Sequence, residues 1–164
     1  MQDQIAGRVL LAHAGLEIED FAIAGHDGAE VLLSVVRSKT NDRASARPVL
    51  YFAHGGGMML GNRRTGIDAL FGWIQRYDAV LITVDYRLAP EFPDPTPIED
   101  SYAGLVWTTE HAAELGIDPS RLLLVGKSAG GGLMAGTALL ARDRGGPEIL
   151  GQLLMYPLLD DRDS

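Results

Sequence analysis

Short apolar segments alternate with longer amphipathic ones along most of this chain, and this alternation constrains the fold more than any other feature. The apolar segments span residues 49–54, 79–86, 121–126 and 149–156, and the segments typical of amphipathic helices span residues 65–77, 98–115 and 129–142. An almost uninterrupted apolar run such as 79–86 is typical of a strand covered on both faces. The alternation predicts an α/β fold with a mainly parallel sheet and helices on both faces.

Two further strands are expected at residues 17–24 and 29–36, joined by a hairpin turn that contains Gly25 and Gly28. The proline-rich stretch 87–97 is expected to be a loop. With 164 residues the chain is long enough for one domain with its own core. We expect a single domain over residues 1–164.

The composition excludes several classes of protein. Fourteen basic and 22 acidic residues give a net charge of −8, which speaks against a nucleic-acid footprint or a polybasic membrane patch. Cysteine is absent, which rules out disulfides, thiolate catalysis and cysteine-ligated metals. No apolar stretch reaches the roughly 20 residues that span a bilayer, and Asp3 and Arg8 make the N-terminus a poor signal peptide. We therefore expect a soluble cytoplasmic protein.

The sequence Gly126-Lys127-Ser128-Ala129-Gly130 falls between a predicted buried strand and a predicted helix. At a sharp strand-to-helix turn the serine hydroxyl is exposed, and flanking glycines let the turn close. The pattern predicts that Ser128 is a nucleophile supported by Gly126 and Gly130. The alternative is a flexible turn in which Ser128 only caps the helix.

The same Gly-Lys-Ser string also ends a phosphate-binding P-loop. The first glycine of that motif would have to stand where Arg121 does, and the intervening residues 122–125 are apolar and strand-like. A phosphate cradle needs a polar, turning loop. Nucleotide binding is therefore not expected.

A second glycine cluster, His54-Gly55-Gly56-Gly57, follows another predicted strand. Backbone N–H groups that face a developing oxyanion stabilise it, and a triple glycine lets such groups point inward without side chains in the way. Together with the N–H of Ala129, this cluster predicts an oxyanion hole. The alternative is a tight loop that binds nothing.

Four motifs in order, HGGGMMLGN, VDYRLAPEFP, GKSAGGG and MYPLLDD, resemble the hormone-sensitive-lipase-like branch of the α/β-hydrolases, which are carboxylesterases. The resemblance runs from about Ile18 to the last residue. It implies that residues 1–164 form a single, incomplete domain, in which residues 1–16 are the remnant of a cap or leader region. It implies hydrolysis of short-to-medium acyl esters with no cofactor and no metal. The implied partner is a small-molecule ester, with no role for nucleic acid or a membrane.

The resemblance also implies roles for individual residues. Ser128 would be the nucleophile, and His54 would order the loop whose glycines, with Ala129, form the oxyanion hole. Asp85, Arg87 and Glu91 would be structural, tying their loop near the site. Lys127 departs from the family, which more often has a small or acidic residue there. It is either a solvated surface lysine or a cation that stabilises the oxyanion.

The same family supplies its triad in the order Ser, then Asp or Glu, then His. No histidine follows Ser128, and the resemblance places the catalytic acid and histidine beyond residue 164. His54 belongs to the glycine cluster, His111 is expected on a solvated helix face, and His13 and His26 are expected far from the strand ends. We therefore expect little or no esterase activity from this chain alone.

Residues 149–156 are expected to form an edge strand with an uncovered apolar face, a surface suited to self-association. Two other functions stay open. One is a non-catalytic small-molecule-binding member of the family, whose fold includes a plant hormone receptor without the catalytic histidine. The other is a truncated reading frame with no function.

Overall fold

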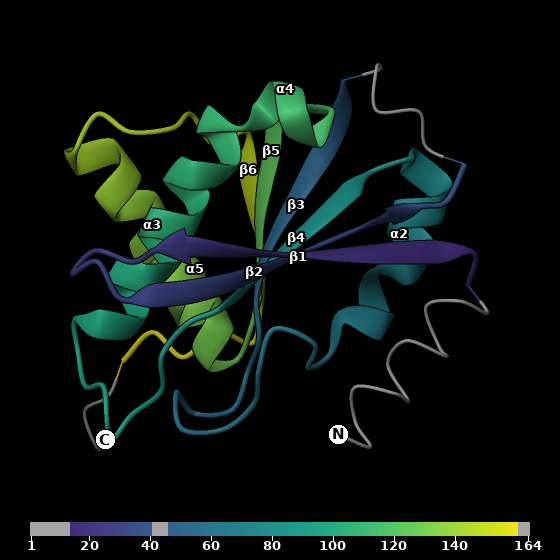
Figure 1. The fold of residues 1–164 in the computed structure, drawn as a ribbon. Helices are drawn as coiled ribbons and strands as arrows, with labels where there is room; N and C mark the ends of the chain where they lie inside the picture. Colours follow the sequence, from purple (N-terminus) through teal and green to yellow (C-terminus); the bar gives the residue numbers. More distant parts are fainter. Residues whose placement is uncertain (1–13, 41–45, 161–164) are drawn as a thin grey trace.

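The computed structural model describes residues 14–40 and 46–160, and the centre of this part is one sheet with the strand order β1-β2-β4-β3-β5-β6 (Figure 1). Its strands are β1 (Leu16–Ala24), β2 (Glu30–Ser38), β3 (Arg47–Ala53), β4 (Val80–Asp85), β5 (Ile117–Lys127) and β6 (Gly151–Met155). β1 pairs antiparallel with β2, and β2 with β4, whereas the β4–β3, β3–β5 and β5–β6 pairs are parallel. The predicted mainly parallel sheet with an N-terminal hairpin is confirmed.

Helices cover both faces of this sheet, as predicted (Figure 1). One face carries α3 (Thr96–Glu110), α4 (Ala112–Leu115) and α5 (Ala129–Asp143), and the other carries η1 (Ile67–Leu70) and α2 (Phe71–Tyr77). Neighbouring residues of β3 divide between the two layers, because successive strand side chains point to opposite faces. Tyr51 packs into the first layer and Phe52 into the second, and each is at most 1% exposed.

Some helix boundaries differ from the prediction. The helix expected at residues 65–77 begins with the 3-10 turn η1, because Gly66 precedes it in a left-handed conformation with φ 76°. The helix expected at residues 98–115 begins at Thr96, since a proline such as Pro97 is tolerated in a first helical turn. It ends at Glu110, where a break separates it from the short α4.

Several strand boundaries also differ, among them the starts of β5 and β6. β5 begins before the predicted residue 121 because Ile117 already pairs with Arg47 of β3, with a register shift between Arg47 and Val49. β6 begins two residues after the predicted start, where Gly151 pairs with Leu123. Neither difference moves the carboxyl ends of the strands, which is where the glycine clusters lie.

The hairpin turn lies at this same edge of the sheet. Leu32 of β2 lies opposite Asp85 at the end of β4, so the antiparallel β2 begins where the parallel strands end. The prediction that His26 lies far from the strand ends is therefore wrong. His26 stands in the turn, and its Nδ1 is 3.7 Å from Oδ1 of Asp100, which is in the first turns of α3.

The remaining N-terminal predictions fall largely on undescribed sequence. His13 and nearly all of the expected leader or cap remnant, residues 1–16, lie outside the described residues. None of the helices within residues 14–40 and 46–160 combines the length and the apolar character needed to cross a bilayer.

Candidate active site

Ser128 occupies a sharp turn between β5 and α5. Its φ of 55° and ψ of −121° belong to a region that non-glycine residues rarely adopt. Backbone hydrogen bonds hold it there: its N–H donates to the Met155 carbonyl at 2.9 Å, and its own carbonyl accepts from Gly131, Gly132 and Leu158. The side chain makes no capping hydrogen bond to α5. Ser128 stands at the N-cap position without acting as a side-chain cap.

The glycines flanking the serine allow the turn to lie directly against the end of β3. A Cβ placed on Gly126 would overlap the Gly130 carbonyl, and a Cβ placed on Gly130 would overlap the carbonyls of Ala53 and His54. No larger residue fits either position without a backbone shift. We call this turn, residues 126–130, the elbow.

The glycine loop, residues 54–63, approaches the elbow from β3. A Cβ placed on Gly55 would lie only 3.3 Å from Cβ of Ser128. Gly56 and Gly57 have φ values of 137° and 63°, which turn the backbone as side-chain-bearing residues rarely can. Ala129 is buried and opens α5, so its N–H is one of the first-turn amides that lack an intrahelical acceptor. The two predicted glycine clusters thus meet at one point.

His54 orders the start of the glycine loop. Its ring is fully buried, and Nδ1 lies 2.8 Å from the Gly55 carbonyl, to which it donates as a neutral imidazole. Burial lowers the pKa of His54, so the ring is neutral at pH 7. Tyr86 stacks on the ring with centroids 4.4 Å apart and donates its hydroxyl to the His54 carbonyl at 2.8 Å. Sequence reasoning did not single out Tyr86, whose only signal is its place at the end of a buried strand.

Asp85 holds the other arm of the glycine loop. Its carboxylate accepts hydrogen bonds from the backbone N–H of Arg63 at 3.2 Å and from Nη1 of Arg63 at 2.6 Å. The same guanidinium donates from Nε to Ser34 Oγ at 2.9 Å and from Nη2 to Asp20 at 3.3 Å. The sequence analysis named Asp85 but missed its partner Arg63 and the contacts of Arg63 with Ser34 and Asp20, because these residues come from distant segments that no local spacing relates.

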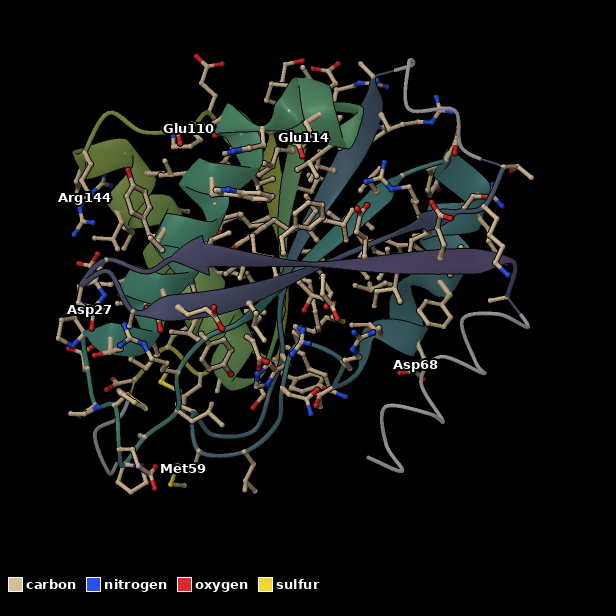
Figure 2. All side chains as sticks on the ribbon, viewed as in Figure 1. Asp27, Met59, Asp68, Glu110, Glu114 and Arg144 are labelled. Carbon is tan, nitrogen blue, oxygen red and sulfur yellow. The ribbon has the colours of Figure 1, made fainter. Side chains whose placement is uncertain are left out.

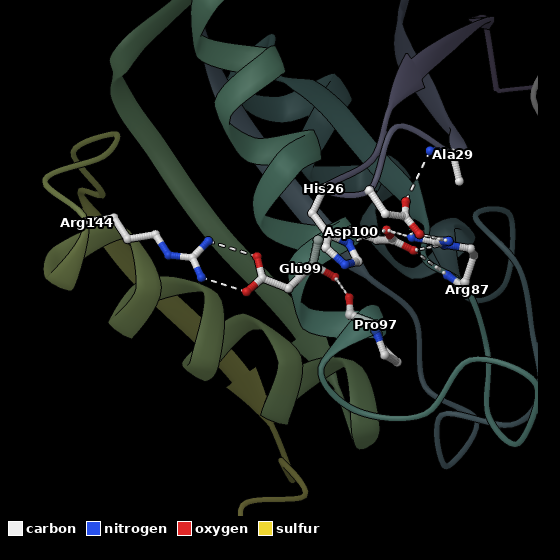
Figure 3. Close-up of polar contacts among 9 residues, drawn as sticks. His26, Ala29, Arg87, Pro97, Glu99, Asp100 and Arg144 are labelled. Atoms are coloured by element: carbon white, nitrogen blue, oxygen red, sulfur yellow. Dashed lines mark hydrogen bonds and ion pairs between the residues drawn. The ribbon is translucent and has the colours of Figure 1, made fainter.

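Arg87 ties the loop after β4 to the hairpin turn and to α3 (Figure 3). It donates from Nη1 and Nη2 to the Asp27 carboxylate at 2.8 and 3.0 Å, and from Nε and Nη2 to the fully buried Asp100, both at 2.8 Å. The hydrogen bonds that Arg87 donates to Asp100 and Asp27 raise the pKa of Arg87. These contacts suit the structural role implied for Arg87, whereas Glu91 is exposed.

This clamped loop also contacts the glycine loop, since the Ala89 N–H donates to the Met58 carbonyl at 2.8 Å. Met58 is itself in a left-handed conformation, with φ 62°. The next residue, Met59, projects outward at the tip of the glycine loop and is 59% exposed (Figure 2). The glycine loop therefore has a fixed base and an exposed apolar tip.

Lys127 lies on the surface beside the elbow. Its ammonium is 5.8 Å from the centre of the Tyr156 ring, and a hydrogen bond with the Tyr156 side chain raises the pKa of Lys127. The side chain is exposed and charged at neutral pH. This exposure agrees with the first of the two alternatives for Lys127, a solvated surface lysine.

His111 is not on a solvated helix face, so that prediction is wrong. The residue ends α3, its ring stacks on Trp107 with centroids 4.3 Å apart, and Nδ1 lies 2.9 Å from the Trp107 carbonyl. It is half-buried. A histidine at a helix end can turn back over the preceding turn, which a position counted along a continuous helix does not reveal.

Known proteins resemble this chain in sequence and in structure. A family described as alpha/beta hydrolase fold matches residues 49–164. Carboxylesterase NlhH of Mycobacterium tuberculosis is 50% identical over 110 residues, which are 67% of this chain and 34% of that protein. Esterase LipI of the same species is 42% identical over 145 residues, 88% of this chain and 45% of its own length.

A solved structure agrees with both. Bacterial Heroin Esterase superposes with a TM-score of 0.87 at 40% sequence identity, over 98% of this chain and 51% of that one. The chain thus spans between about a third and about half of the length of the relatives it matches.

Proposed function

Because this chain belongs to the α/β-hydrolase fold family, we propose that it carries the nucleophile and the oxyanion hole of a serine hydrolase that acts on carboxylic esters. Relatives that are named carboxylesterase and esterase support the reaction class. The observation that carries the proposal is the meeting of the two glycine clusters, where a Cβ on Gly55 would lie 3.3 Å from Cβ of Ser128. The same Cβ would lie 2.9 Å from the Lys127 carbonyl oxygen, so a glycine at this position lets the two backbones approach each other closely.

In the proposed reaction, Ser128 Oγ bonds to the ester carbonyl carbon while the carbonyl π pair moves onto oxygen. The amides of Gly55, Gly56, Gly57 and Ala129 stabilise the resulting oxyanion, and loss of one such donor typically costs about 10²–10³ in rate. Collapse of the intermediate breaks the bond to the alcohol oxygen and leaves an acyl-serine. Water then hydrolyses this ester and releases the carboxylic acid.

The serine proton must pass to a base, and the leaving alcohol oxygen must gain one. Each described histidine is engaged elsewhere: His54 with the Gly55 carbonyl, His111 with the Trp107 carbonyl, and His26 beside Asp100. The family order of the triad puts the acid and the histidine after Ser128 in the sequence. We therefore propose that the 164-residue chain by itself turns esters over slowly, since loss of a triad member costs on the order of 10⁴–10⁶ in kcat.

Covalent labelling tests the nucleophile. The purified chain is exposed to a fluorophosphonate, with and without added imidazole as an external base, and the adduct is located by mass spectrometry. We expect slow labelling at Ser128 that imidazole accelerates, and none in Ser128→Ala. Ser120 is the internal control, because it is exposed and lies outside the elbow.

The outcomes separate the alternatives. Equal labelling of Ser120 and Ser128, or no adduct on Ser128 in folded protein, would overturn the assignment of Ser128 as the nucleophile. The alternative of a non-catalytic binding protein would then be favoured. Rapid hydrolysis of p-nitrophenyl butyrate without imidazole, abolished by Ser128→Ala, would support the nucleophile but show that the chain needs no external base.

A further inference from the structure

The hairpin β1–β2 lies outside the matched residues 49–164, yet one of its carboxylates reaches the glycine loop. Asp20, in the middle of β1, accepts hydrogen bonds from Nη2 of Arg63 at 3.3 Å and from Nη2 of Arg64 at 2.9 and 2.7 Å. We propose that Asp20 is a positioning residue for the glycine loop. The proposal rests on the proposed function, because it concerns the loop assigned there to the oxyanion hole.

The glycine loop is held at its two ends by consecutive residues, Asp85, which is the last residue of β4, and Tyr86, which follows it. Tyr86 binds the His54 carbonyl at the start of the loop, and Asp85 binds Arg63 at its end. Thr83, also on β4, donates its hydroxyl to the Arg63 carbonyl at 2.8 Å. Asp20 adds a further attachment at the end of the loop, and it comes from a different strand. It is the only one of these partners that comes from the edge of the sheet.

Ser34 of β2 fixes the geometry between the hairpin and the loop. Its hydroxyl donates to Oδ1 of Asp20 at 2.6 Å and accepts from Nε of Arg63 at 2.9 Å. The carboxylate therefore cannot turn away from the arginines without breaking its bond to Ser34. Since Ser34 is fully buried, loss of this link would leave its hydroxyl with one partner fewer.

The ion pairs among Asp20, Arg63, Arg64 and Asp85 require the negative charge of Asp20. The side chains of Arg63 and Arg64 are only 12% and 15% exposed. Asp20 pairs with both arginines, and Asp85 pairs with Arg63. Burial acts to raise the pKa of Asp20, but hydrogen bonds from Ser34 and Arg63 and the charge of Arg64 outweigh it, so the pKa is lowered and the group is ionised. Removing the charge takes a carboxylate partner away from two largely buried cations, which favours opening of the loop arm.

Two amides inside the loop report whether it is closed. The N–H groups of Met59 and Leu60 both donate to the Gly56 carbonyl, at 3.1 and 3.0 Å. Their hydrogen exchange requires that this turn opens. The Tyr51 amide in central strand β3 reports opening of the sheet instead.

The test compares hydrogen exchange by NMR in wild type, Asp20→Asn and the matched control Glu99→Gln. Glu99 also forms a two-bond pair with an arginine, Arg144, at 2.8 and 2.6 Å, but joins α3 to α5 away from the loop (Figure 3). We expect Met59 and Leu60 to exchange at least about fivefold faster in Asp20→Asn, a modest factor because Asp20 is partly exposed. In Glu99→Gln they should keep the wild-type rate, and Tyr51 should be unchanged in both variants.

The second readout links the loop to the chemistry. The rate of imidazole-assisted fluorophosphonate labelling at Ser128 should fall in Asp20→Asn and recover partly in Asp20→Glu. Unchanged exchange at Met59 and Leu60, or equally faster exchange at Tyr51, overturns the positioning role. If wild type is not labelled, the proposed function fails while the exchange comparison still decides the role of Asp20.

Discussion

Tyr86 holds His54 in two ways at once. Its ring stacks on the imidazole with an interplanar angle of 14°, and its hydroxyl donates to the His54 backbone carbonyl at 2.8 Å. Both residues are at most 1% exposed. The backbone that enters the glycine loop is therefore fixed by a tyrosine at the end of the neighbouring strand.

We expect Tyr86→Phe to lower the free energy of unfolding by about 1–3 kcal/mol, because the stack remains but the buried His54 carbonyl loses its donor. Urea denaturation measures the change. Tyr77→Phe is the matched control, since Tyr77 is 60% exposed, and should stay within about 0.5 kcal/mol of wild type. Equal effects of the two variants would contradict the role given to the buried hydroxyl.

Gly130→Ala should destabilise the fold, whereas Gly72→Ala should not. A Cβ at Gly130 overlaps two carbonyls at the end of β3, while a Cβ at Gly72, inside α2, meets nothing within 4 Å. We expect a loss of several kcal/mol for Gly130→Ala, or failure to fold. Alanine at Gly72 should raise stability by roughly 0.5–1 kcal/mol through its helix propensity. Thermal unfolding followed by circular dichroism compares them, and a stable Gly130→Ala protein would refute the close contact.

Stability should fall in acid partly through Asp27. Hydrogen bonds from Arg87 and the Ala29 N–H hold the pKa of Asp27 well below its ordinary value. A carboxylate whose pKa is lower in the folded state stabilises the fold above its unfolded pKa of about 3.9, and this contribution is lost as the pH falls towards the folded value. Between pH 6 and pH 2.5, urea unfolding should therefore show a smaller loss of stability for Asp27→Asn than for wild type. Parallel pH curves would contradict this expectation.

We propose that the chain self-associates through the β6 edge. Exposed large apolar side chains lie directly before and after β6 in the sequence, namely Leu150, Tyr156, Leu158 and Leu159. The opposite edge, β1, carries Glu17, Glu19 and Asp20, and such charges discourage strand pairing. The average mass from light scattering should rise with protein concentration in wild type, fall towards the monomer in Leu150→Lys/Leu159→Lys, and resemble wild type in the control Tyr77→Lys. A monomer at every concentration would rule out this association.

The local pattern of the sequence was enough to predict most helices and strands and to place both glycine clusters at the ends of strands. Residues 121–130 show why: an apolar run, a glycine-flanked serine and a helix follow one another directly, so the backbone conformation depends on neighbours in the chain. Errors arose where a position depends on partners elsewhere. His26 was misplaced because the antiparallel pairing of β2 with β4 puts its turn at the carboxyl edge, and no residue near His26 encodes that pairing.

The order of residues along the chain determined the backbone geometry of each turn, because glycine content and strand or helix periodicity act over a few residues. The folded arrangement alone decided that Gly55 lies against Ser128 and that Asp20, Ser34, Arg63 and Asp85 converge on one loop. Apart from the Asp20–Ser34 contact within the β1–β2 hairpin, these contacts join segments that are distant along the chain and are brought together by the sheet order β1-β2-β4-β3-β5-β6. Hydrogen bonds and ion pairs act over a few ångströms in space, whatever the separation along the chain.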